Sequence, residues 1–351
     1  MSNQTSDNNK RIAKNTLLLY FRMFFIMAVS LFTSRVVLKT LGVEDFGIYN
    51  VVGGIVAMMG ILNGAMSVST QRYLTFELGK GDMVRLKQVF STCFLIYLIL
   101  SGIFLVLAET IGLWFLNSKL VIPEDRIVAA NWVYQFSIIS CINTLMANPY
   151  NAVLIAREKM NIYAYISILE VVLKLAIVYL LLVISLDRLI IYGGLYLLMS
   201  IVITMIYRIY CIKNYQESRF QFYWDKPLFM QLMSYSGWNL FGSLSSLVKG
   251  QGLNILLNMF FNPAVNASRG IAYQINNAIT QFFTNFYTAV RPQITKYYAQ
   301  GDLDNMFKLV FRSSKFSFYL IFLLSLPIII EAPYIIQLWL GQLPDYVVPF
   351  T

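Results

Sequence analysis

Histidine is missing from this chain of 351 residues, and charged residues make up only 13% of it. Without imidazole, histidine-based catalysis and histidine-ligated metal sites are excluded. The three cysteines, Cys93, Cys141 and Cys211, are scattered over apolar segments and show neither metal-ligand spacing nor a disulfide framework. The sequence also lacks a phosphate-binding loop, a nucleotide fingerprint and paired carboxylates in a soluble domain. We therefore expect no catalytic residues, no cofactor, no metal, and a protein that is not an enzyme.

Apolar residues dominate what is present. Hydrophobic residues make up 58% of the chain, and its mean hydropathy is +0.63. Its 13% of charged residues is about half of the roughly 25% that a soluble domain carries. Several windows exceed the roughly 18 apolar residues that are typical of a membrane helix. The sequence predicts an all-α integral membrane protein with helices at 15–38, 46–68, 90–116, 128–148, 162–185, 189–210, 233–257, 267–290 and 316–340. A tenth span begins near the C-terminal end and stops at once.

The same order of segments occurs twice along the chain, at 41–90 and again at 261–310. Each copy contains a turn, an apolar span, a basic linker and another apolar span, and the pairs Gly81-Asp82 and Gly301-Asp302 recur in register. A unit built twice with its core in lipid is typical of transporters. We predict two helical lobes that face each other across a cavity. The N-terminal lobe would span 1–212, a cytoplasmic linker 213–228, and a partial, truncated C-terminal lobe 229–351.

Positive charge is distributed unevenly over the alternate loops. Eighteen lysines and arginines fall in segments on the side of the N-terminus, and four fall in the opposite loops, namely Lys39, Lys119, Arg126 and Arg188. Short cytoplasmic loops are enriched in lysine and arginine. The sequence therefore predicts a cytoplasmic N-terminus, and the net charge of +10 is explained by membrane orientation rather than by nucleic-acid binding.

Several polar and charged residues fall inside the predicted membrane helices. A charge in lipid costs at least about 2.5–3.5 kcal/mol, so such residues normally face a cavity or a partner. Arg22, Lys249 and Arg269 are the candidate cavity cations. The predicted helices 233–257 and 267–290 each carry a polar stripe, from which we predict a cavity lining of Asn239, Ser243, Tyr273, Asn276, Asn277 and Thr280. The alternative for any single member is an interhelical hydrogen bond.

Glu170 and Lys174 lie four residues apart on the predicted helix 162–185 and therefore share a face. They form either a mutually neutralised structural pair or a site that couples transport to an ion.

The linkers and prolines give further expectations. Asp82 and Asp302 should cap the helices that follow them, and the basic helices that begin there should lie along the cytoplasmic membrane surface. Helix boundaries are expected at three prolines and a kink at a fourth: Pro149 after a helix, Pro227 before one, Pro292 at the end of one, and Pro327 inside the last one.

The motifs SRVVLKTLG, LGVEDFGIYNVVGG and STQRYLTFELGKGD resemble the N-terminal lobe of bacterial polysaccharide (O-antigen type) flippases, and NPAVNASRGIAYQINNAI is similar to their second lobe. These proteins belong to the multidrug/oligosaccharidyl-lipid/polysaccharide (MOP) exporter superfamily, which also holds the multidrug MATE transporters. The resemblance implies a two-lobe bundle in the bacterial inner membrane that flips polyprenyl-diphosphate-linked oligosaccharides by alternating access. It also implies membrane lipid and polysaccharide-assembly proteins as partners, no nucleic acid, and a cationic cavity that includes Arg22, Lys249 and Arg269.

Two other functions stay open. A multidrug or cation antiporter of the same superfamily would need carboxylates deep in the lobes, whereas the deep charges here are mostly cationic. A membrane glycan polymerase or transferase would need a large outer loop with catalytic residues, and the longest outer loop is only about 117–127.

Overall fold

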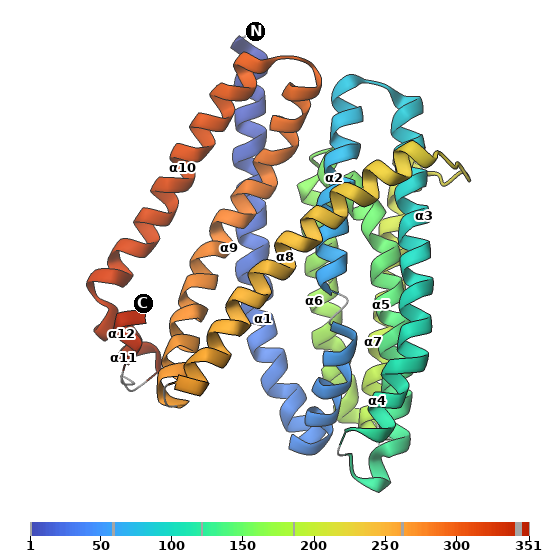
Figure 1. Ribbon diagram of the computed structural model, residues 1–351, viewed down its shortest axis with the longest axis vertical. Helices are drawn as coiled ribbons and strands as arrows, with labels where there is room; N and C mark the ends of the chain where they lie inside the picture. The colour runs from blue at the N-terminus through green and yellow to red at the C-terminus, as the bar shows by residue number, and fades with distance from the viewer. Residues whose placement is uncertain are drawn as a thin grey trace. The chain divides into compact units, whose positions relative to one another are not determined.

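The computed structural model describes residues 2–57, 60–120, 122–184, 187–260, 263–340 and 346–350 (Figure 1). Every regular element in these ranges is a helix, which confirms the predicted all-α class. Six of the helical segments described are long and apolar enough to cross a membrane. The α-helices are α1 (Ser2–Ala57), α2 (Gly60–Lys80), α3 (Met83–Leu107), α4 (Leu113–Ser118), α5 (Ile127–Ala156), α6 (Met160–Val183), α7 (Arg188–Asn214), α8 (Lys226–Phe260), α9 (Pro263–Ala299), α10 (Leu303–Ile330), α11 (Ala332–Leu340) and α12 (Val347–Phe350).

Three short elements complete the list. A π-helical turn, η1 (Ala108–Gly112), joins α3 to α4. The 3-10 turns η2 (Glu124–Arg126) and η3 (Gln216–Ser218) lie before α5 and after α7.

The chain divides into two compact units. The large unit contains Phe21–Leu240, and the small unit contains Met1–Tyr20 together with Phe241–Thr351. Both boundaries fall inside helices, in α1 and in α8. The lobes predicted at 1–212 and 229–351 and the linker at 213–228 stay a prediction.

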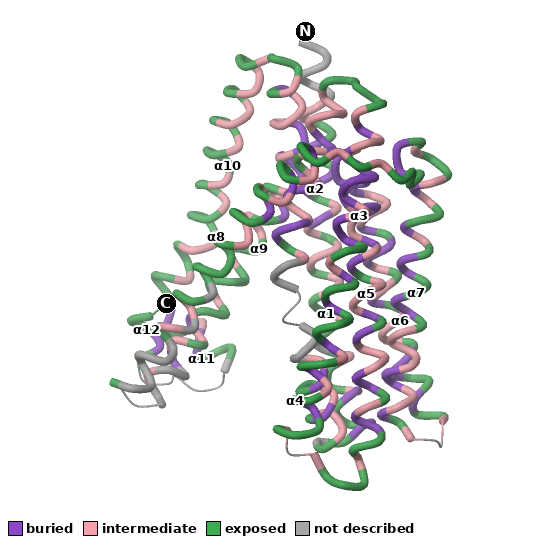
Figure 2. The backbone as a smooth tube through the Cα atoms, turned by 45° about the vertical axis from the view of Figure 1, so that its right-hand side comes forward, coloured by how far each residue is buried: buried purple, intermediate pink, exposed green. Residues whose placement is uncertain are grey.

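In the large unit, α5 is the central helix and packs against α2, α3, α6 and α7. Its core contains fully buried large side chains such as Phe90, Tyr97, Tyr134 and Leu154, and Figure 2 shows buried residues on every helix of this bundle. In the small unit, α9 packs against α10 and α12. A small apolar cluster of Ala332, Ile336 and Val347 lies there against α9.

Glycines at positive φ end three helical runs. Gly42 (φ 84°) interrupts α1 and separates the predicted helices 15–38 and 46–68. Gly81 (φ 78°) and Gly301 (φ 74°) end α2 and α9, where the missing Cβ removes the steric penalty of this conformation. The predicted caps are confirmed. The Asp82 carboxylate accepts from the backbone amide of Arg85 at 2.8 Å, and the Asp302 carboxylate accepts from the backbone amide of Asn305 at 3.2 Å.

The predicted surface helix after Gly81 is wrong. The residues that follow Asp82 form the first turns of the uninterrupted α3, and Leu86 and Val89 are 1% and 0% exposed within the protein core. Residues after Asp302 likewise begin the uninterrupted α10. The amphipathic pattern marks the half-buried start of a long helix, because protein as well as lipid can cover an apolar stripe.

Three of the proline boundaries are also wrong. Pro149 lies inside α5, Pro292 lies inside α9, and Pro227 occupies the first turn of α8 rather than preceding it. Proline removes one backbone donor, yet long helices in membranes tolerate it when neighbours satisfy the freed carbonyl. Pro327 lies inside α10 as predicted.

Arg126 connects three helices of the large unit. Its guanidinium donates to Asp45, in the part of α1 beyond Gly42, at 2.5 and 2.8 Å, and to Asp187, just before α7, at 2.8 and 3.4 Å. Asp187 also accepts from the amides of Leu189 and Ile190 and thereby caps α7. Arg126 itself precedes α5, so one side chain holds α1, α5 and α7 together.

Candidate functional site

The predicted cation Arg22 lies on α1 in the large unit. Its guanidinium carbon is 4.4 Å from the ring centroid of Tyr163 on α6, which is a cation–π contact. The Arg22 Nε is buried and has no hydrogen-bond partner among the described residues. A stacked guanidinium of this kind is held in place by the ring, and its Nε lacks the acceptor that an anionic ligand would supply.

Glu170 and Lys174 are brought together on α6. The Lys174 Nζ donates to Glu170 Oε1 at 2.7 Å. The Lys174 side chain is 30% exposed and the Glu170 side chain is 36% exposed. Lys174 also lies 5.5 Å from the ring of Tyr196 on α7. Tyr196 in turn packs with Tyr192 and with Tyr49. This geometry favours the neutralised pair, and a role in ion coupling stays a proposal.

Three predicted site residues, Asn239, Ser243 and Lys249, lie on α8. The Asn239 amide donates to the backbone carbonyl of Tyr235 at 2.9 Å, so part of its capacity is used within the helix. Ser243 and Lys249 are exposed, like most of the residues between them. Their neighbour Ser236, by contrast, is buried and bonds back to the Leu232 carbonyl. The polar stripes predicted from the sequence also include Asn254 and Asn266, whose side chains lie outside the described residues.

The α9 stripe lies on one exposed side of its helix. Arg269 is half-buried, with its guanidinium 5.9 Å from the ring of Tyr273, one turn further along. Asn276, Asn277 and Thr280 are exposed, and Thr280 lies within hydrogen-bonding distance of Asn276 at 3.5 Å. Ala272, Ala289 and Val290 on the same helix are buried. The stripe therefore presents amide, hydroxyl and cationic groups away from the packed side of α9.

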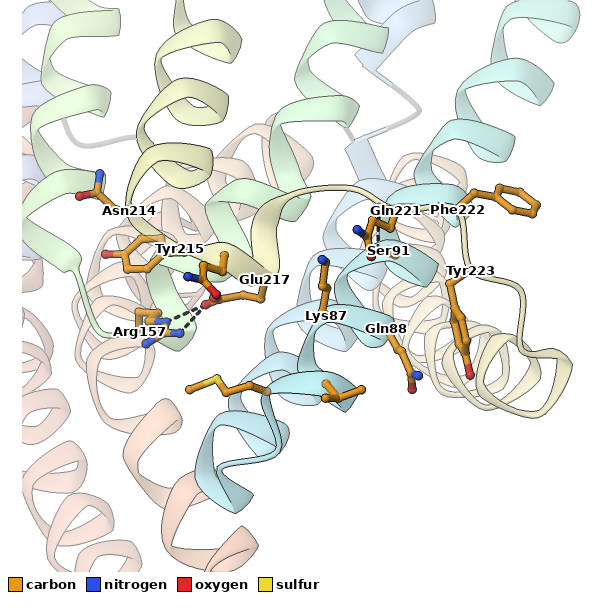
Figure 3. A pocket seen from close by; sticks show the side chains of 13 residues that line it. Lys87, Gln88, Ser91, Arg157, Asn214, Tyr215, Glu217, Gln221, Phe222 and Tyr223 are labelled. Carbon is orange, nitrogen blue, oxygen red and sulfur yellow. Dashed lines mark hydrogen bonds and ion pairs between the residues drawn. The ribbon is translucent and has the colours of Figure 1, made fainter.

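The sequence did not predict a cavity of about 740 Å³ in the large unit, where the start of α3 meets the segment that follows α7 (Figure 3). Arg157 donates to Glu217 at 2.5 and 2.8 Å, and the Gln221 amide donates to Ser91. Because Arg157 and Glu217 neutralise each other, Lys87 is the remaining charged group on the described lining. These contacts dock residues 215–223 onto the large unit. No local sequence signal pairs Arg157 with Glu217, because 60 positions separate them.

A second ion pair fixes the same segment. Arg85, near the start of α3, donates to the Asp225 carboxylate at 3.0 Å, just before α8 begins. This hydrogen bond from Arg85 lowers the pKa of Asp225 from its usual value of 3.8, and the Leu228 amide contributes in the same direction.

The depressed pKa of Asp225 predicts a pH dependence. A carboxyl whose pKa is lower in the folded state adds stability above its unfolded pKa and loses it as the pH falls through the folded pKa. We expect Asp225→Asn to lower the unfolding midpoint by about 1–2 °C at pH 7, and this difference should shrink as the pH falls below 3.8 towards the lowered pKa of Asp225. Unfolding scans of both proteins in detergent between pH 3 and 7 measure it. Asp304→Asn is the matched control, and an equal effect there would contradict the assignment to the Arg85 pair.

The fold and these sites define a multi-pass membrane protein of the transporter class. The chain belongs to the polysaccharide biosynthesis protein family, which it matches over residues 12–298. No curated protein matches its sequence.

Solved structures agree on the fold. A MATE transporter in the straight conformation superposes with a TM-score of 0.80 at 14% identity, over 98% of this chain and 77% of that one. The Vibrio cholerae MATE transporter VcmN in the bent form gives 0.79 at 17% identity, over 98% and 78%. An outward-facing multidrug resistance MATE transporter of the MOP superfamily gives 0.77 at 15% identity, over 94% and 74%. The family and the fold together indicate a transporter of the MOP superfamily rather than an enzyme, as the motifs predicted.

Proposed function

We propose that the protein is a flippase that moves a polyprenyl-diphosphate-linked oligosaccharide across the bacterial inner membrane. It would act by alternating access, in the biosynthesis of a surface polysaccharide such as the O-antigen of lipopolysaccharide. Membership of the polysaccharide biosynthesis protein family supports a glycan cargo. Such a cargo has a long apolar tail, an anionic diphosphate and a polar sugar chain, and each part needs a different surface.

The observation that carries the proposal is a half-buried, stacked arginine with a buried Nε in a membrane helix. Arg22 lies on a segment long and apolar enough to cross a membrane, and its Nε is aimed at no acceptor among the described residues. A diphosphate carries about two negative charges, and a guanidinium binds such oxygens through two parallel hydrogen bonds. We assign Arg22, Lys249 and Arg269 to the diphosphate.

The sugar would contact the exposed polar groups of the small unit and of α8. Amides and hydroxyls such as those of Asn276, Asn277 and Thr280 both donate and accept hydrogen bonds, as sugar hydroxyls require. Asn239, Ser243 and Tyr273 complete the proposed lining. Because these groups are uncharged, they would bind sugars with little discrimination by charge and release them readily.

The test is translocation in proteoliposomes. Purified protein is reconstituted with a fluorescent undecaprenyl-diphosphate-linked oligosaccharide, and a membrane-impermeant reagent quenches the lipid in the outer leaflet. We expect the fluorescent lipid to become accessible to the quencher at least ten-fold faster in these proteoliposomes than in protein-free vesicles. If the rate equals that of empty vesicles while a cationic drug is exported against a proton gradient, the protein is an antiporter.

The antiporter alternative has one observation in its favour, which is a carboxylate inside a membrane helix. Glu170 could exchange a proton or a cation, although its pairing with Lys174 opposes this. Glu170→Gln separates the cases. An antiporter should lose its pH-driven export, whereas a flippase in which the pair is structural should keep its translocation and lose only stability.

The proposed orientation makes a separate prediction. Cysteines placed at Ser2, Lys80 and Gln300 should be labelled by an impermeant maleimide only after the cells are opened, because this orientation would put the basic segments in the cytoplasm. A cysteine at Lys119, in an opposite loop, is the matched control and should be labelled on intact cells. Labelling of the first three sites from outside would reverse the orientation.

A further inference from the structure

Two adjoining cavities lie in the small unit where the N-terminal part of α1 meets α9 and the start of α10. The larger one has a volume of about 580 Å³ and the smaller one about 140 Å³. Asn9, Ile12, Leu309 and Arg312 line both, so the two cavities share a wall. None of the residues assigned to the proposed cargo lines either of them, which makes this a separate site.

The larger cavity is mostly apolar. Its wall includes Ile12 and Leu17 of α1, Phe286 and Val290 of α9, and Phe316 of α10. Ile12 and Val290 are buried, whereas Leu17 and Phe316 are 68% and 58% exposed. These last two lie on segments that are long and apolar enough to cross a membrane. Its mouth is therefore lined by apolar side chains that would face lipid, and it has room for a hydrocarbon chain.

The smaller cavity is polar and cationic. Lys308 and Arg312 line it, and Lys10 lines the larger cavity beside the shared Asn9 and Arg312. Among the described residues, no aspartate or glutamate lines either cavity. Asp302, just before α10, accepts from the side-chain amide of Asn305 at 2.8 Å and interacts electrostatically with Lys308, but it does not line either cavity. Three cations thus gather at one end of an apolar cavity.

The polar wall is held by internal hydrogen bonds. Asn8 donates to the Tyr297 hydroxyl at 2.8 Å. Arg11 donates to the Asn8 side-chain oxygen at 2.9 Å and to Gln293 at 3.0 Å. The part of the wall formed by Asn8, Gln293 and Tyr297 is therefore held in place before any ligand arrives, which reduces the entropic cost of binding one.

We propose that this pair of cavities binds an anionic phospholipid, with its phosphate at Lys308 and Arg312 and one acyl chain in the apolar cavity. Guanidinium and ammonium groups are natural partners of a phosphate diester, and basic pockets between membrane helices suit anionic headgroups. The placement of this lipid in the cytoplasmic leaflet follows from the proposed orientation, while the site itself does not depend on the proposed function. The bound lipid would join α1 to α9 and α10.

Native mass spectrometry of the purified protein released from nanodiscs tests the site. Nanodiscs of phosphatidylcholine doped with phosphatidylglycerol should yield a one-to-one phosphatidylglycerol adduct, which pure phosphatidylcholine does not give. Lys308→Gln and Arg312→Gln should each weaken retention about ten-fold, and Ala13→Phe, which fills the apolar cavity, should do the same. Lys14→Gln and Lys315→Gln remove cations from α1 and α10 that line neither cavity, and both should retain the lipid.

Competition then identifies the ligand. Glycerol 3-phosphate, which has the phosphate but no chain, should displace the lipid only at a concentration at least a hundred-fold higher. Equal loss in the control variants, or retention in Arg312→Gln and Lys308→Gln alike, would overturn the proposal. So would polyprenyl diphosphate that displaces phosphatidylglycerol at equal concentration, since the cavities would then belong to the cargo path. Lys308 is exposed, so Lys308→Gln should fold. The test therefore stays decisive even if another variant does not fold.

Discussion

Arg126→Ala should lower the unfolding midpoint of the protein by about 4–6 °C. The replaced guanidinium makes four hydrogen bonds to two carboxylates, and its side chain is only 21% exposed, with Asp45 at 16% and Asp187 at 32%. Charge-assisted hydrogen bonds of this kind contribute about 1.5–3 kcal/mol when partly buried. Discounted for partial exposure, a net loss of about 2–3 kcal/mol is reasonable, and each kcal/mol shifts the midpoint by about 2 °C in a chain of this size.

The loss should exceed that of removing either partner. Without Arg126, Asp45 and Asp187 face each other with no cation between them, and like charges at close range destabilise. Asp45→Asn combined with Arg126→Ala should therefore recover part of the stability. Lys39→Ala is the matched control, because Lys39 is an exposed cation of the same predicted outer side. Detergent unfolding scans measure all three, and a midpoint for Arg126→Ala equal to that of Lys39→Ala would show that the network contributes nothing.

The sequence predicts where helices end better than it predicts which helices pack against each other. Gly81-Asp82 and Gly301-Asp302 act within a few residues, so local rules predict both the left-handed glycine and the capping aspartate. The helical class follows from hydropathy in the same way. Local rules fail for Pro149 and Pro292, because packing against other helices outweighs the missing backbone hydrogen bond.

Long-range ion pairs are the part that sequence could not supply. Arg126 finds Asp45 and Asp187 at separations of 81 and 61 residues, and Arg85 finds Asp225 at a separation of 140. Any of the basic loop residues could have paired with any of the acidic ones. Loop composition shows that cations and acids are present at each end of the bundle, but only the three-dimensional packing of α1, α5 and α7 selects the partners.

In the candidate site, too, local features could be predicted from the sequence and long-range contacts could not. That Glu170 and Lys174 share a face, and that the α9 polar residues form one stripe, follows from helical periodicity alone. That Arg22 stacks on Tyr163 does not, because the two residues lie on different helices and 141 positions separate them in the sequence. The ring is what turns a lone arginine in a membrane helix into a positioned group.

The cations should govern translocation if they hold the diphosphate. Arg22→Ala, Lys249→Ala and Arg269→Ala should each slow translocation about ten- to hundred-fold at normal expression, because one charge-assisted contact is worth about 1.5–3 kcal/mol. Arg269→Lys should retain part of the rate, since it keeps the charge but loses the two-pronged geometry. Lys14→Ala, an exposed cation on the same helix as Arg22, is the control and should transport normally.

Tyr163 allows a sharper test of the Arg22 geometry. Tyr163→Phe keeps the aromatic face and should keep the rate, whereas Tyr163→Leu removes the face on which the guanidinium rests at 4.4 Å. With Tyr163→Leu, we expect a weaker apparent affinity for the diphosphate lipid and a smaller change in maximal rate, because the charge remains but is no longer held in place. A purely structural arginine would instead show loss of stability with normal affinity in the folded fraction. If all three alanine variants translocate at the rate of Lys14→Ala, the cations are structural, and the antiporter alternative with Glu170 as its titrating group becomes the better explanation.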